Sequence, residues 1–166
     1  MDKVKGDLIK MFRKGHFDII VHGCNCGNNM GDGIAKAIKE EFPQAYAVDK
    51  ATPKFDMQKL GTYTKAETEY GTIINAYTQY HWYGEGTHGG PLTEYPALRL
   101  IFRKLFIEFG GKGLVFGVPA IGCGRAGGDW NVVSKIIDQE LKGEDVVFVE
   151  FDGVDAIRGD YKRNMR

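Results

Sequence analysis

The fold is indicated most directly by residues 18–42, which read DIIVHGCNCGNNMGDGIAKAIKEEF. The segment opens with a short apolar run from Asp18 to Cys24 that is rich in β-branched residues, as expected for a strand buried on both faces. From Gly33 to Phe42 apolar residues recur at helical spacing, and Pro43 ends the pattern. We therefore predict a strand, a glycine-rich loop and a helix.

A second unit of the same kind lies further along the chain. We predict a strand at Gly113–Ile121, a loop at Gly122–Asp129, a helix at Trp130–Leu141 and a strand at Val146–Phe151. Between the two units we predict strands at Leu60–Thr64 and Thr72–Thr78 and a helix at Thr93–Phe109. This alternation of strands and helices is typical of an α/β domain with a mostly parallel sheet.

The bulk composition is that of an ordinary globular domain. At 166 residues, with 43% hydrophobic and 27% charged residues, the chain has the size and composition of one folded domain. Its 22 lysines and arginines balance 22 aspartates and glutamates, so it lacks the net positive field of a general nucleic-acid binder. A small anion is compatible with this balance, because backbone N–H groups and helix N-termini bind anions without extra basic side chains.

The cysteines and the N-terminal residues exclude further classes. Cys24, Cys26 and Cys123 lack the even number and the CxxC spacing of a disulfide framework or a structural zinc site. The histidines and scattered acids form no metal signature, so we predict neither a metal nor a cofactor. No apolar run follows the first charged residues, and no window reaches membrane-spanning length. We therefore expect a cytoplasmic protein without a membrane partner.

Two glycine-rich loops follow two of the predicted strands. Open parallel sheets bind ligands at the carboxyl ends of their strands, so the two loops can form the walls of one cleft. Each loop leads into a helix, whose first N–H groups favour a phosphate by ~0.3–1 kcal/mol or more. A pyrophosphate would fit both loops, although glycines that only make tight turns would give the same pattern. The glycines concerned are Gly27, Gly31 and Gly33 in the first loop and Gly122, Gly124, Gly127 and Gly128 in the second.

The second loop also satisfies the GxGxxG pattern of dinucleotide-binding proteins. Residues 122–127 read GCGRAG between a predicted strand and a predicted helix, and Glu150 stands at the end of the next strand. That pattern belongs to the first strand–helix turn of a fold with two mononucleotide-binding halves, whereas about 40 residues remain beyond it here. A nicotinamide or flavin dehydrogenase is therefore the weaker alternative.

Residues 22–35, HGCNCGNNMGDGIA, are similar to the first ligand loop of macrodomains. The pattern resembles most closely the yeast-type ADP-ribose-1''-phosphate phosphatase branch, whose loop reads much like HxCNCxxxxGGGIA. Residues 5–8 resemble the opening motif of the family and residues 119–124 its second loop, so the resemblance covers most of the chain. It implies a three-layer α/β/α macrodomain with a mixed, mostly parallel central sheet over residues 1–157, followed by a polar tail at 158–166.

The resemblance also implies a ligand. This would be ADP-ribose or ADP-ribose 1''-phosphate, with ADP-ribosylated macromolecules as a further class of partner. Asp7 would hydrogen-bond the adenine amino group, Asn25 would contact the distal ribose, and the backbones of the two loops would hold the phosphates. The ligand-binding residues expected on this basis are Asp7, Leu8, Asn25, Gly31, Asp32, Gly33, Ile34, Gly122, Cys123, Gly124, Arg125, Ala126, Gly127 and Gly128.

Four residues are expected to take part in catalysis, namely His22, Asn25, Asp32 and Asp129. By resemblance to the phosphatase branch, His22 would activate a water or protonate the leaving hemiacetal oxygen, since a histidine with a pKa near ~6.5 exchanges protons at neutral pH. Asn25 would orient the ribose, and the two aspartates could position a water or act as acids. The competing interpretations are a buried His22 bonded to the backbone, and aspartates that cap the following helices, a contribution of ~0.5–2 kcal/mol.

Two departures from the family bear on the reaction. Macrodomains that remove ADP-ribose from glutamate or DNA tend to carry a lysine after the central strand, where Gln79 stands here and cannot act as a lysine nucleophile. Ala126 stands where those branches have an acid. Lysine-dependent chemistry is therefore not expected, and the resemblance to the phosphatase branch implies hydrolysis of ADP-ribose 1''-phosphate to ADP-ribose and phosphate. The alternatives are a binding module without turnover and a hydrolase that frees ADP-ribose from protein or nucleic acid with a water held at Asn25 and Asp32.

An aromatic segment follows the central strand and includes Tyr80, His81, Trp82, Tyr83 and His88. Such side chains could close over a ribose or an adenine. Packing beneath a long loop is the commoner explanation.

Overall fold

The computed structural model describes residues 1–152 of the chain. The predicted domain boundary at residue 157 and the predicted tail at 158–166 lie outside the described residues. The elements follow in the order β1 (Asp2–Gly6), α1 (Leu8–Arg13), β2 (Ile19–Asn25), α2 (Gly33–Glu41), α3 (Pro43–Lys50), η1 (Met57–Lys59, a 3₁₀ turn), β3 (Tyr63–Thr68), β4 (Gly71–Gln79), α4 (Tyr95–Phe109), β5 (Val115–Val118), α5 (Trp130–Glu140) and β6 (Asp145–Phe151).

The strands form one mixed sheet in the order β1-β6-β5-β2-β4-β3. Its β3 and β4 pair antiparallel, whereas the other neighbouring strands are parallel. β2 lies inside the sheet and is apolar on both faces, because Ile19 and Val21 pack toward one helical layer and Ile20 toward the other. These features confirm the predicted fold class, three layers around a mixed, mostly parallel sheet.

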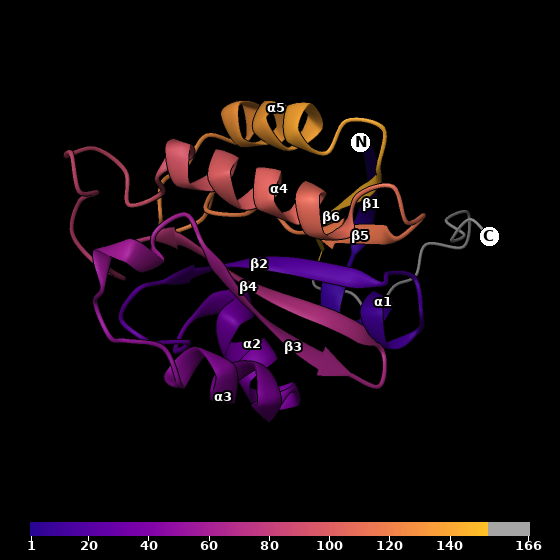
Figure 1. The fold of residues 1–166 in the computed structure, drawn as a ribbon, viewed down its shortest axis with the longest axis horizontal. Coiled ribbons are helices and arrows are strands. Elements are labelled where there is room, and N and C mark those ends of the chain that lie inside the picture. The colour runs from indigo at the N-terminus through magenta and orange to yellow at the C-terminus, as the bar shows by residue number, and fades with distance from the viewer. Residues whose placement is uncertain (153–166) are drawn as a thin grey trace.

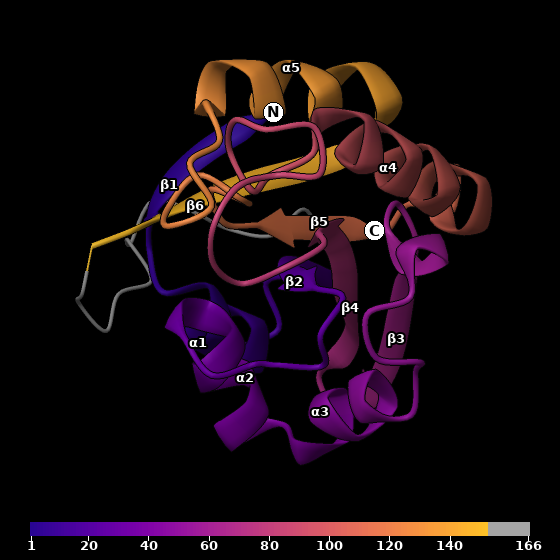
Figure 2. The ribbon, with the colours of Figure 1, turned by 90° about the vertical axis from the view of Figure 1, so that its left-hand side faces the viewer.

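Helices cover both faces of the sheet (Figures 1 and 2). α4 and α5 lie on one face, where Leu98 and Phe102 join Phe116 of β5 in a buried cluster. α1, α2 and α3 lie on the other face, with Phe12 and Ile38 in the second cluster. Each fully buried side chain of this kind contributes roughly 1.5–3 kcal/mol. No helix within residues 1–152 has both the length and the apolar character needed to span a bilayer.

The structure differs from the prediction at several places. β5 spans only Val115–Val118 within the predicted Gly113–Ile121. Pro43 ends α2 but also begins α3, because a proline fits the first turn of a helix, where its missing N–H would have no partner. β3 begins at Tyr63 rather than at Leu60, which closes the turn after η1. β1 and α1 were not predicted. In β1 only Val4 has an apolar side chain, and the strand is defined by its parallel pairing with β6.

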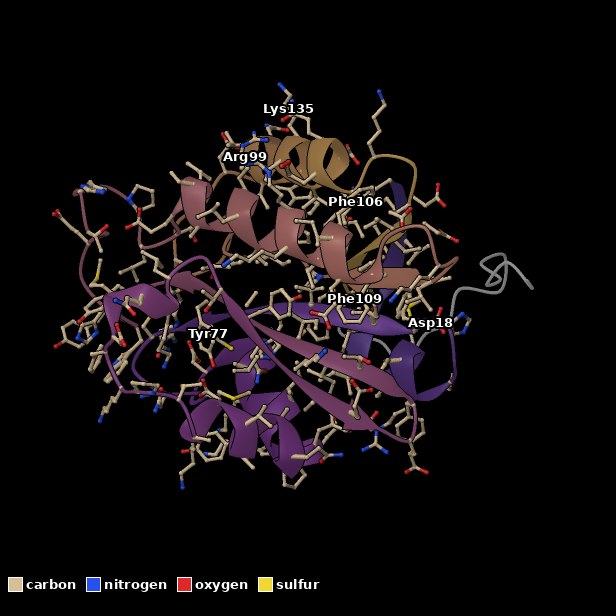
Figure 3. The ribbon with its side chains drawn as sticks, viewed as in Figure 1. Asp18, Tyr77, Arg99, Phe106, Phe109 and Lys135 are labelled. Atoms are coloured by element: carbon tan, nitrogen blue, oxygen red, sulfur yellow. The ribbon has the colours of Figure 1, made fainter. Side chains whose placement is uncertain are left out.

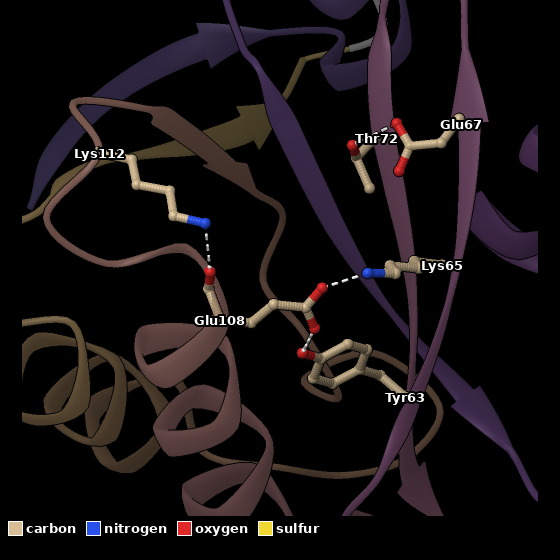
Figure 4. Close-up of polar contacts among 6 residues, drawn as sticks. All are labelled: Tyr63, Lys65, Glu67, Thr72, Glu108 and Lys112. Carbon is tan, nitrogen blue, oxygen red and sulfur yellow. Dashed lines mark hydrogen bonds and ion pairs between the residues drawn. The ribbon is translucent and has the colours of Figure 1, made fainter.

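A polar contact ties the edge strand β3 to α4 (Figure 4). Glu108, in the last turn of α4, accepts hydrogen bonds from the Tyr63 hydroxyl and the Lys65 ammonium group, both on β3. Lys112 Nζ donates to the Glu108 carbonyl oxygen at 2.9 Å, so a cation also lies at the C-terminus of the helix. The edge of the sheet is thereby fixed to the layer above it.

Both glycine-rich loops lie at the same edge of the sheet. β2 ends at Asn25 and β5 at Val118, and because these strands are parallel neighbours, their carboxyl ends lie side by side. β1, which ends at Gly6, and β4, which ends at Gln79, run in the same direction and end at this edge too.

Candidate ligand-binding cleft

A cleft of about 510 Å³ lies between the two glycine-rich loops. Its walls come from residues within 23–35 and 119–126, together with Gln79, Trp82 and Leu92. The volume is in the range of small-molecule sites, roughly 300–1,000 Å³. The cleft opens at the carboxyl edge of the parallel strands, as predicted, which is where α/β sheets bind ligands.

Another hollow, of about 600 Å³, lies over β3 and the end of α4. Its polar lining includes Tyr63, Lys65 and Glu108, which already bond to one another. None of its lining residues belongs to either glycine-rich loop. We therefore take the cleft, and not this hollow, as the candidate site.

Asn25 organises the first loop at the end of β2. Its Oδ1 accepts hydrogen bonds from the Gly27 N–H at 3.0 Å and the Asn29 N–H at 3.4 Å, and its Nδ2 donates to the Asn29 carbonyl oxygen at 2.8 Å. Asn25 also lines the cleft. A side-chain amide has two N–H donors, and the second one finds no partner within residues 1–152, so it is available to a ligand.

The first turn of α2 faces the cleft without a side-chain cap. Asp32 occupies the N-cap position but makes no capping hydrogen bond. Its Oδ2 instead lies 3.0 Å from the Arg125 guanidinium, which reaches across from the second loop. Within residues 1–152 the N–H groups of Gly33, Ile34 and Ala35 have no acceptor, and all three residues line the cleft. Such a helix N-terminus is an anion-binding arrangement.

The second loop is folded onto Thr93, just before α4. The Thr93 hydroxyl donates to the Gly122 carbonyl oxygen at 2.6 Å, and the Thr93 N–H donates to the Ala126 carbonyl oxygen at 3.1 Å. Gly122 has φ +70°, and a Cβ there would lie 2.4 Å from Thr93 Oγ1, so this position requires glycine. The folded loop turns Gly124, Arg125 and Ala126 to the cleft, and their N–H groups have no acceptor in the described part of the chain.

His22 lies in the core behind the first loop. The side chain is fully buried, does not line the cleft, and has Nε2 2.7 Å from Asn75 Oδ1. Asn75 Nδ2 already donates to Ala45 and Thr64, so Oδ1 is an acceptor and His22 carries its proton on Nε2. Burial lowers the pKa of His22 from 6.5 to about 4, and the Asn75 hydrogen bond opposes this shift. In the structure His22 is a buried histidine, bonded to a side chain rather than to the backbone and outside the lining of the cleft, and its proton exchange with the ligand stays a prediction.

Asp129 and Asp7 both cap helices. Asp129 Oδ1 accepts from the Asn131 N–H at 2.8 Å, and Asp7 Oδ1 accepts from the Lys10 N–H at 3.0 Å. Asp129 does not line the cleft, so the capping interpretation describes it, and its predicted catalytic role lacks contact with the site. Asp7 follows β1 at the edge of the sheet that holds the cleft, but it does not line the cleft, and its contact with a ligand stays a prediction.

The remaining predicted residues divide into two groups. Asn25, Gly31, Asp32, Gly33, Ile34, Gly122, Gly124, Arg125 and Ala126 line the cleft, whereas Leu8, Cys123, Gly127 and Gly128 do not. Leu8 packs in the core, and Cys123 Sγ turns to the Ile121 carbonyl oxygen. The N–H groups of Gly127 and Gly128 close the second loop by bonding to Gly124 and Gly122. These four residues therefore shape the site without facing it.

An aromatic cluster supports the first loop from outside. Trp82, 40% exposed, lines the cleft, and its ring lies 5.4 Å from that of Phe55. A Cβ at Gly27 would lie 2.4 Å from Trp82 Cζ3 and 2.5 Å from Phe55 Cζ, so both rings pack directly on the loop backbone. Sequence reasoning singled out Trp82 but missed Phe55, along with Gln79 and Asn29 as lining residues; nothing near Phe55 in the sequence signals the contact.

Comparison with known proteins extends these observations. No family model matches the chain. An uncharacterised 17.5 kDa protein of Enterobacteria phage T4 is 32% identical over 157 residues, which span 90% of this chain and 95% of the phage protein. ADP-ribose 1''-phosphate phosphatases of Neosartorya fischeri and Aspergillus fumigatus are 39% identical over 46 residues, which span 28% of this chain and 22% of theirs.

Solved structures share the whole fold. A macrodomain protein from Streptomyces coelicolor superposes with a TM-score of 0.67 at 25% identity, over 89% of this chain and 97% of that protein. A Trypanosoma brucei macrodomain in complex with ADP-ribose superposes with a TM-score of 0.64 at 16% identity, over 90% of this chain and 63% of that one. Sheet order, layers and the position of the cleft thus define an α/β domain with its ligand site at the carboxyl edge of the sheet. The chain has the macrodomain fold.

Proposed function

We propose that the cleft binds ADP-ribose. The observation that carries this proposal is the presence of two sets of backbone N–H groups on opposite walls, residues 33–35 and 124–126, none with an acceptor within residues 1–152. Two such sets match the two phosphates of a pyrophosphate, because each can bind one anionic group through peptide dipoles. The macrodomain fold of the chain and the ADP-ribose bound to the structurally similar T. brucei macrodomain support the same ligand.

The nucleoside ends are assigned by the side chains beside these walls. Asp7 Oδ1 is held by the Lys10 N–H, which leaves Oδ2 for the adenine amino group at the end of β1. Asn25, with one N–H to spare, contacts the distal ribose. With these two assignments the proposed ligand crosses the carboxyl ends of β1, β6, β5 and β2.

We further propose that the chain hydrolyses ADP-ribose 1''-phosphate. Water attacks phosphorus, the bond from phosphorus to the C1'' oxygen breaks, and the products are ADP-ribose and inorganic phosphate. Arg125 leaves Asp32 to pair with the terminal phosphate, and the freed Asp32 carboxylate takes a proton from the attacking water. The departing C1'' oxygen takes up a proton from solvent, and Asp32 afterwards returns its own proton to solvent. The 46-residue similarity to the fungal phosphatases supports this reaction. Because His22 does not line the cleft, we propose a structural part for it.

The test is release of phosphate from ADP-ribose 1''-phosphate. Asp32→Asn should lower kcat by about 100-fold or more, the usual contribution of a general base. His22→Gln should keep most of the activity, because its side chain does not reach the ligand. Calorimetry with ADP-ribose should show binding in all three proteins. Wild-type protein that binds no ADP-ribose would refute the site itself.

The second candidate is a binding module without turnover. The observation in its favour is that no histidine lines the cleft among the described residues, so the usual acid or base at neutral pH is missing. Binding of ADP-ribose without phosphate release, and without ADP-ribose release from modified protein or DNA, would select this function.

A further inference from the structure

A buried lysine lies beneath the first loop. Lys59, the last residue of η1, is only 6% exposed. Its Nζ donates to the Cys26 carbonyl oxygen at 3.1 Å and to Asn28 Oδ1 at 2.5 Å. Lysine is almost never fully buried unless its ammonium group is paired. Here both partners belong to a turn of the ligand loop that lies 31 to 33 residues before Lys59 along the chain.

The turn held by Lys59 is the strained part of the loop. Asn28 has φ 55°, in the left-handed region that non-glycine residues rarely adopt. Its Oδ1 accepts a hydrogen bond from the Lys59 ammonium group, and its Nδ2 donates to the Thr52 carbonyl oxygen at 2.9 Å. The Cys26 carbonyl oxygen also accepts the Phe55 N–H at 2.7 Å. Lys59 therefore bonds to both ends of a three-residue turn. The rings of Phe55 and Trp82 pack on the backbone of its middle residue, Gly27.

A carboxylate on α3 provides the counter-charge. Asp49, 1% exposed, accepts a hydrogen bond from the Tyr77 hydroxyl at 2.8 Å, and Lys59 Nζ lies 4.7 Å from the centroid of the Tyr77 ring. Tyr77 lies on the side of the sheet covered by α2 and α3 (Figure 3). Burial lowers the pKa of Lys59, and the Asp49 carboxylate opposes that shift. The Asp49 carboxylate and the Tyr77 ring thus stabilise the charge of the ammonium group, while its hydrogen bonds go to the first loop.

We propose that Lys59 is a positioning residue for the ligand. By fixing the turn at residues 26–28, it sets the direction in which Asn25 and the first N–H groups of α2 face the cleft. Lys59 does not line the cleft itself, so it acts through the loop. The proposal rests on the proposed binding of ADP-ribose.

The first test is calorimetry with ADP-ribose on Lys59→Met and on the control Lys142→Met, an exposed lysine after α5 that does not line the cleft. Loss of hydrogen bonds from a charged donor should weaken binding by Lys59→Met about tenfold. The control should stay within about twofold of wild type. Lys59→Arg, which keeps the charge and the donors, should restore part of the affinity. A Lys59→Met protein with a lower Tm but wild-type affinity would show a merely structural role and overturn the proposal.

A second measurement needs no ligand. Trp82 packs on Gly27, so in a Trp130→Phe background its fluorescence reports on the turn. Lys59→Met should make Trp82 more accessible to acrylamide, whereas Lys142→Met should not. If wild type fails to bind ADP-ribose but this change occurs, the proposed function fails and the role of Lys59 in shaping the loop stands. Unchanged quenching would refute that role. If Lys59→Met does not fold, Asn28→Ala removes the same hydrogen bond, with the same expected loss of affinity and gain in quenching.

Discussion

Protonation of His22 should destabilise the folded protein in a pH range set by its burial. The folded-state pKa is about 4, against 6.5 for a free histidine, so between these values the unfolded chain binds the additional proton. Stability contributed by the neutral imidazole is therefore complete above pH 6.5 and is lost as the pH falls toward 4. For these two pKa values linkage gives a loss of about 2 kcal/mol between pH 7.5 and pH 5, rising to about 3 kcal/mol below pH 4.

Urea denaturation at several pH values measures this loss, with His22→Gln as the reference. Glutamine can donate to Asn75 Oδ1 but does not titrate, so subtracting the two pH profiles removes the contribution of the other ionisable groups. The difference between wild type and variant should shrink by about 2 kcal/mol between pH 7.5 and pH 5. Parallel profiles would refute the reasoning. An NMR titration that shows His22 ionising near pH 6.5 in the folded protein would refute it independently.

Two further changes test the second loop. Gly122→Ala places a methyl group 2.4 Å from Thr93 Oγ1 at a φ of +70°, so we expect a loss of about 2 kcal/mol or more in unfolding free energy together with loss of ADP-ribose binding, measured by urea denaturation and calorimetry. Unimpaired binding would show that the loop tolerates a different path. Asp129→Ala removes the cap of α5 and should lower the unfolding free energy by about 1 kcal/mol with unchanged ADP-ribose affinity. A tenfold loss of affinity in that variant would instead show that Asp129 contributes to ADP-ribose binding.

The parts of the fold that could be predicted are those with a strong local pattern. β2 was expected at residues 18–24 and lies at Ile19–Asn25, because a strand buried on both faces is a continuous apolar run. α5 shows the same agreement, owing to its regular helical spacing. β1 could not be found in this way, because its residues are mostly charged and the parallel pairing with β6 comes from the distant end of the domain.

In the candidate site, too, the features with a local sequence pattern could be predicted, and those that depend on distant contacts could not. The positions of the two glycine-rich loops at one edge follow from the general direction of strands in an α/β sheet, so the cleft could be predicted. The part played by His22 could not, because alternation along a strand places a side chain on one face without saying whether a ligand or the core lies there. Lys59 and Phe55 gave no signal, since their contacts with the first loop join segments far apart in the sequence.

A cleft whose donors are mainly peptide groups has a consequence for how affinity responds to the solvent. Amide hydrogens neither titrate in the physiological range nor attract a counterion atmosphere, in contrast to lysine or arginine clusters. Binding of a diphosphate by such a wall should therefore vary little with buffer acidity, apart from the ionisation of the ligand itself. Added salt should weaken it far less than it weakens phosphate recognition through several cationic side chains.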